Sequence, residues 1–125
     1  MADQFILSGS YTVAPLSATS LDPSLATTID EPLALKSKQF SDMTLSVDTP
    51  VTVPFGTVVN AHIVILKALG GKVKARITSA DGATQAIPFD TFLILMSQTV
   101  PITAIDLTRV LATATTVKVF LGEKA

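Results

Sequence analysis

Apolar and polar residues alternate along most of the chain after Pro32. Such alternation places successive side chains on opposite faces of a strand, so it predicts strands that bury one face. The runs that show it best are 43–48, 73–78, 105–108 and 116–121. Segment 58–68 is a longer strand-type run. Segment 92–97 (FLILMS) is almost continuously apolar, so we expect either a buried strand or a strand with one face on a partner.

Turn signals separate these runs. Gly70-Gly71 and Asp81-Gly82 suit tight turns between strands. Val51 and Val53 lie between two prolines, which predicts an edge strand or a connection because proline cannot donate to a ladder. No helix of about ten or more residues is predicted. Roughly eight to ten short strands at this spacing predict an all-β fold, an antiparallel β-sandwich for which a jelly roll is a candidate form.

The first part of the chain has a different composition, rich in Ser, Thr, Ala and Pro. Residues 5–13 predict one short strand, 14–28 show no period, and 20–23 suit one helical turn. The segment is too apolar for a typical disordered tail. We therefore expect an extended N-terminal arm over 1–31 that lies on a neighbouring surface, followed by a β-sandwich domain over 32–125. A long ordered loop packed on its own domain is the alternative.

The composition favours a single domain with apolar surface to cover. A chain of 125 residues forms one ordinary core, and the absence of cysteine excludes disulfides and thiolate sites. The hydrophobic fraction of 48% and mean hydropathy of +0.53 are high. A spanning helix needs about 20 apolar residues, whereas 58–69 contains Asn60, His62 and Lys67, and the N-terminus lacks the positive start of a signal peptide. We expect the excess to be buried in an alanine-rich core or against other subunits.

Candidate chemistry is sparse. His62 is the one histidine, and no serine lies in a nucleophile-elbow motif with which it could form a catalytic triad. The ten carboxylates are scattered along the sequence. A small hydrolase would need a pair brought together in space from residues such as Asp42, Asp90 and Asp106. Lys67, Lys72, Lys74 and Arg76 form a basic stretch, which is either a dock for an acidic surface or a solvated strand face. We expect no catalytic residue, cofactor, metal site or enzyme activity. The balanced charge, with nine basic and ten acidic residues, argues against nucleic-acid binding, and no membrane partner is expected.

The apolar and aromatic residues of the arm and of segment 92–97 are the predicted interface. They are Phe5, Leu7, Tyr11, Leu16, Phe92, Ile94 and Met96. A homo-oligomer built through them would be symmetric. Tyr11 also suits stacking on a sugar, although the chain has no Trp and only this Tyr.

Three segments resemble small virion structural proteins of tailed bacteriophages: 78–88 (TSADGATQAIP), 100–110 (VPITAIDLTRV) and 117–123 (VKVFLGE). The resemblance covers about residues 55–123. It implies a non-enzymatic structural subunit of the virion, in the head as a decoration or cement protein or in the tail or baseplate. Its partners would be further copies of itself and other virion proteins. The alternative is a receptor- or glycan-binding β-sandwich module at a tail tip.

Overall fold

The computed structural model describes residues 3–12, 26–97 and 99–125, and these residues form strands but no helix. Within them no helix is long and apolar enough to cross a membrane. The strands, in chain order, are β1 (Asp3–Thr12), β2 (Ala26–Leu45), β3 (Val51–Thr52), β4 (Ile63–Leu69), β5 (Val73–Ser79), β6 (Thr84–Phe89), β7 (Phe92–Met96), β8 (Ile102–Arg109) and β9 (Thr115–Lys124).

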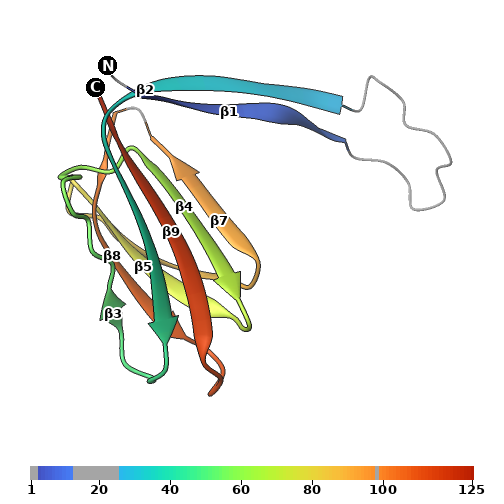
Figure 1. The fold of residues 1–125 in the computed structure, drawn as a ribbon, viewed down its shortest axis with the longest axis vertical. Coiled ribbons are helices and arrows are strands. Elements are labelled where there is room, and N and C mark those ends of the chain that lie inside the picture. Colours follow the sequence, from blue (N-terminus) through green and yellow to red (C-terminus); the bar gives the residue numbers. More distant parts are fainter. Residues whose placement is uncertain (1–2, 13–25, 98) are drawn as a thin grey trace, which may run out of the picture.

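Two antiparallel sheets stack to form a sandwich (Figure 1). One has the order β1-β2-β9-β4-β7 and is called the front sheet. The other has the order β3-β8-β5-β6 and is called the back sheet. Without β1, consecutive strands from β2 to β9 fill the two sheets in the order of an eight-stranded jelly roll. The predicted all-β antiparallel sandwich is confirmed, and its topology is the jelly roll named as a candidate form.

The main core fills the space between the sheets, as the alternation predicts. Val64 and Leu66 of the front sheet and Ile105 and Leu107 of the back sheet are fully buried members of one cluster. Burial of such side chains contributes about 1.5–3 kcal/mol each.

Strand β2 belongs to two parts of the molecule. Its second half pairs with β9 inside the sandwich, whereas its first half pairs with β1 from Asp3↔Leu35 to Thr12↔Ala26. This hairpin, the arm, extends away from the sandwich in Figure 1. The predicted strand at 5–13 therefore corresponds to β1, and β2 runs unbroken through the predicted boundary at 31/32. The predicted helical turn at 20–23 lies outside the described residues.

The connection before β4 is longer than the sequence pattern indicates. The run 58–68 predicts one strand, but β4 begins at Ile63. Val58 and Ala61 are buried in the core from this connection, and Ala61 forms an isolated bridge with Ile102. Apolar residues in a core-lining loop therefore gave the pattern of a longer strand.

Candidate assembly surface

The outer face of the front sheet carries a row of large apolar side chains. The strand registers align Phe40 of β2, Phe120 of β9, Ile65 of β4 and Ile94 of β7 across the sheet. Phe40 is 67% exposed and its ring lies 4.9 Å from that of Phe120. Ile94 is 37% exposed. Cross-strand aromatic and β-branched pairs stabilise a sheet, but on a solvent-facing side they also leave apolar surface uncovered.

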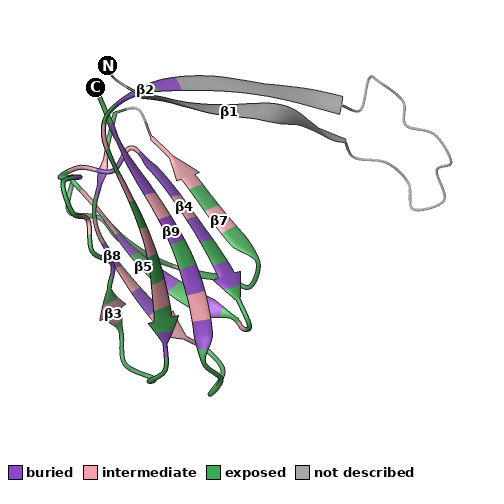
Figure 2. Cartoon of the chain, viewed as in Figure 1, coloured by how far each residue is buried: buried purple, intermediate pink, exposed green. Residues whose placement is uncertain are grey.

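A charged row lies next to the apolar one. Asp42, Lys118, Lys67 and Phe92 are aligned across the same four strands. Lys118 Nζ lies 3.9 Å from Asp42 Oδ2 with both side chains largely exposed, so this ion pair contributes little to stability. Phe92 is 60% exposed at the edge strand, along which Figure 2 shows intermediate and exposed residues.

A second hydrophobic cluster covers the end of this outer face where the arm begins. Leu33, Leu35 and Ile63 are buried there, with Met96 and Phe120 packed against them. The cause is a register shift between Leu35 and Ser37, which leaves one extra residue in β2. Such a bulge reverses which face the following residues occupy. Leu35 therefore pairs with Lys124 on the outer side, whereas Ser37 pairs with Glu123 on the inner side.

Gly122 permits the close packing of this second cluster. A Cβ at position 122 would lie 2.5 Å from Ile63 Cγ2 and 3.0 Å from Leu35 Cδ2. Because carbon atoms normally pack at about 3.5–4.0 Å, the two apolar side chains occupy the space that any other residue would need.

The register of the arm assigns the predicted interface positions of β1 to one face of the ribbon. Phe5 is opposite Leu33, Leu7 is opposite Glu31 and Tyr11 is opposite Thr27. Directly opposed residues of an antiparallel pair share a face, so these positions lie on the face that Leu33 and Leu35 continue into the second cluster. Leu33 and Leu35 therefore join the root of the arm to the apolar outer face of the front sheet.

The predicted interface residues are distributed accordingly. Phe92, Ile94 and Met96 all lie on the outer face of the front sheet, at the edge strand β7. Phe5, Leu7 and Tyr11 lie in β1, and Leu16 is outside the described residues. Their role in an interface stays a prediction.

The sequence analysis missed three members of the same surface, namely Phe40, Ile65 and Phe120. Phe120 sits on the otherwise polar positions of the run 116–121. An aromatic residue at a solvent-facing position was the available signal.

Glu123 is a carboxylate that the sequence analysis did not single out. It is 6% exposed and accepts hydrogen bonds from Ser37 Oγ at 2.9 Å and from the N–H of Val59 at 3.2 Å. Burial by itself raises the pKa of this carboxyl. The hydrogen bonds from Val59 and Ser37 lower it, and the charge of Lys36 and the N–H of Asn60 add to the lowering. The net pKa lies below its ordinary value, so the ionised form ties β9 to β2 and to the connection before β4.

His62 fastens the end of β9. Its Nδ1 accepts a hydrogen bond from the N–H of Lys124 at 3.1 Å, and its own N–H donates to the carbonyl of Gly122 at 2.8 Å. The sequence pattern placed His62 inside a strand over 58–68, but in the structure it lies just before β4.

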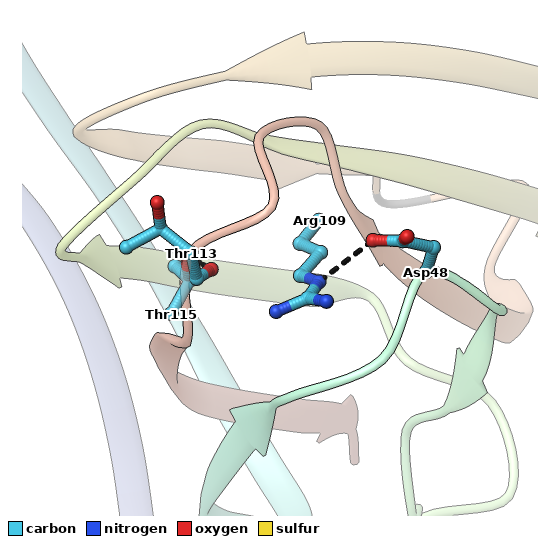
Figure 3. A network of polar contacts seen from close by, with 4 residues as sticks. All are labelled: Asp48, Arg109, Thr113 and Thr115. Carbon is cyan, nitrogen blue, oxygen red and sulfur yellow. Dashed lines mark hydrogen bonds and ion pairs between the residues drawn. The ribbon is translucent and has the colours of Figure 1, made fainter.

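The far end of the sandwich is fastened by polar contacts (Figure 3). Arg109 at the end of β8 donates to Asp48 in the connection after β2, with Nε and Oδ1 2.8 Å apart. Nearby, the buried Thr115 donates to the carbonyl of Thr113 at 3.1 Å. The first contact joins the end of β8 to the connection after β2, at the end of the sandwich away from the arm.

The fold divides the predicted basic stretch between the two sheets. Lys67 lies on the outer face of the front sheet, whereas Lys74 and Arg76 lie on exposed positions of β5 in the back sheet. Among the described residues, no group of three or more His, Cys, Asp and Glu side chains is placed to hold a metal ion.

A pocket of about 480 Å³ opens between the two sheets at the side of their edge strands β6 and β7. Its wall combines apolar and polar side chains, among them Ile77, Ile87, Leu95, Ile102, Ser79, Asp81 and Gln85. This volume suits a small ligand or a side chain of another protein.

A scan against protein-family models found no matching family, and searches of curated proteins and of solved structures found no significant match. The fold and surface define a class of molecule by themselves: a jelly-roll domain with a projecting hairpin arm and an apolar outer sheet face.

Proposed function

We propose that this chain is a non-enzymatic structural subunit that works by assembling with copies of itself and with other proteins, as part of a bacteriophage virion. The observation that carries the proposal is the apolar row on the outer face of the front sheet, where Phe40 is 67% exposed, with Phe92 60% exposed in the row beside it. Monomeric soluble proteins rarely expose such extended apolar surface, and where it occurs it marks an interface.

Two further features support this proposal. The jelly roll is a fold of viral capsid proteins, although lectins and cupins share it, so the fold alone does not decide between them. The resemblance of segments 78–88, 100–110 and 117–123 to virion structural proteins of tailed phages favours the first of these classes.

Two measurements test the proposal. Sedimentation of the purified chain should reveal a defined oligomer at micromolar concentration. An antibody against the chain should label purified phage particles from the source culture at regular positions. A chain that stays monomeric and has no affinity for any particle component would overturn it.

The pocket between the sheets favours a second candidate function, the binding of a receptor or glycan at a tail tip. Its mixed lining, with Ser79, Asp81 and Gln85 beside apolar side chains, offers hydrogen-bonding groups to hydroxyls. A glycan array tests it directly: binding that is lost in Gln85→Ala supports this function, whereas an array without any signal excludes it.

A further inference from the structure

Resting on the proposed function, we propose that the arm of one copy lies across the outer face of the front sheet of a neighbouring copy. The occupant of this exposed face is therefore the hairpin formed by β1 and residues 26–35 of a second molecule. Two observations carry the proposal, namely continuity and charge.

Continuity comes from the second hydrophobic cluster. Leu33 and Leu35, at the root of the arm, pack on Ile63 of the front sheet. Beyond this cluster the chain's own arm leaves the apolar row uncovered, because Phe40 and Phe92 stay exposed with the arm present. A second arm on that row would extend a contact that the molecule already makes at its root.

Charge favours an arm as the occupant. Residues 1–35 contain four acidic residues and no Lys or Arg, which gives a net charge of −4. Residues 36–125 contain nine basic and six acidic residues, which gives +3. Opposite net charges on these two parts of one chain favour association between copies and speed their encounter.

The charged positions fall at suitable places. Glu31 is opposite Leu7 in the register of the arm. On the front sheet, Lys67 and Lys118 stand in the row beside the apolar one. Glu31 of one copy is therefore assigned to Lys67 and Lys118 of the neighbour, with the apolar positions of the arm on the apolar row.

Charge reversal in the full chain tests the assignment. Sedimentation velocity and light scattering would follow the wild type, Glu31→Lys, the pair Lys67→Glu with Lys118→Glu, and the triple variant that combines them. Each single-side reversal should raise the dissociation constant of the oligomer at least tenfold. The triple variant, which restores opposite charges, should return to within about threefold of the wild type.

Two matched controls separate this contact from general charge effects. Asp30→Lys makes a charge reversal next to Glu31 but on the opposite face of the ribbon. Lys74→Glu with Arg76→Glu reverses two charges on the outer side of the back sheet. Because both controls change net charge as much as the tested reversals do, they measure the general charge effect, and each should raise the dissociation constant by less than about threefold. Circular dichroism should show native β structure in every variant.

The outcomes distinguish this inference from the proposed function. An oligomer that is insensitive to the Glu31 and lysine reversals, or that the triple variant fails to restore, overturns the placement of the arm while assembly as such stands. A wild-type chain that is monomeric alone but binds particles overturns the arm exchange and leaves the structural role. A monomer without any particle affinity overturns both.

Discussion

Gly122→Ala is the change that most directly tests the second cluster beneath the arm. The added Cβ would lie 2.5 Å from Ile63 Cγ2, about 1 Å inside normal carbon contact. Ile63 is 0% exposed and sits on the strand paired with Gly122, so it has little room to withdraw. Overpacking of this kind costs about 1–3 kcal/mol, against a gain of about 0.5–1 kcal/mol from replacing a glycine inside a strand.

We therefore expect Gly122→Ala to reduce the free energy of unfolding by roughly 1–2 kcal/mol, which lowers the melting temperature by about 3–8 °C in a domain of this size. Because the chain has no Trp, urea unfolding would be followed by far-ultraviolet circular dichroism. All variants would be compared at one protein concentration, since association adds to apparent stability.

A double-mutant cycle with Ile63→Ala supplies the control. Alone, Ile63→Ala should cost about 2–5 kcal/mol because it leaves a cavity. Combined with Gly122→Ala, it removes the Cγ2 that the new methyl group would meet, so the two losses should fall short of additive by about 1 kcal/mol or more. Additive losses, or a Gly122→Ala variant more stable than the wild type, would refute the packing described.

Three further changes test other parts of the structure. Glu123→Gln should destabilise the fold by about 1–2 kcal/mol at pH 7. Because the pKa of Glu123 is lowered on folding from its ordinary value of 4.5, the stability it contributes is present above that pH and is lost as the pH falls through the lowered pKa. The difference in unfolding free energy between the two proteins should therefore be smaller in acid than at pH 7, and a difference that does not change with pH would contradict this. Asp48→Asn breaks the ion pair with Arg109, in which the Asp48 side chain is exposed. It should change the unfolding free energy by less than about 1 kcal/mol. A larger loss in urea unfolding would show that the pair contributes more to stability than an exposed ion pair does. Phe92→Ser should change the unfolding free energy of the monomer by less than about 1 kcal/mol. It should raise the dissociation constant of the oligomer, measured by sedimentation, at least tenfold, as expected of an aromatic interface residue. An unchanged dissociation constant would show that the edge strand β7 is not part of the interface.

Most of the strands follow directly from the alternation of apolar and polar residues. The runs 73–78, 105–108 and 116–121 coincide with β5, β8 and β9. Their inward positions, such as Val117 and Ile105, are buried as expected. The pairing of strands does not follow from such runs, because alternation marks a buried face without identifying the strand that lies beside it. The contact between Ser37 and Glu123 joins residues 86 positions apart.

The candidate assembly surface depends on the bulge in β2, which the alternation of apolar and polar residues does not reveal. Leu33, Leu35, Met43 and Leu45 all occupy odd positions, so an unbroken strand would place them on one face. The extra residue at Lys36 sends the first two to the outer side and keeps the last two with the interior. A single bulge therefore created the apolar link between sandwich and arm, and no local composition signal distinguishes Lys36 from its neighbours.

The same bulge explains why the arm calls for a partner. In the described part of the chain β1 pairs with β2 alone, and a two-stranded ribbon is at best marginally stable in water unless another surface covers it. The bulge gives the ribbon a fixed root by turning Leu33 and Leu35 onto Ile63, but that root covers only the positions nearest the sandwich. The ribbon beyond that root needs another surface to support it, and the exposed row around Phe40 provides one on each neighbouring copy. An arm placed on this row supports the ribbon and covers the exposed aromatic side chain together, which is why we place them in contact.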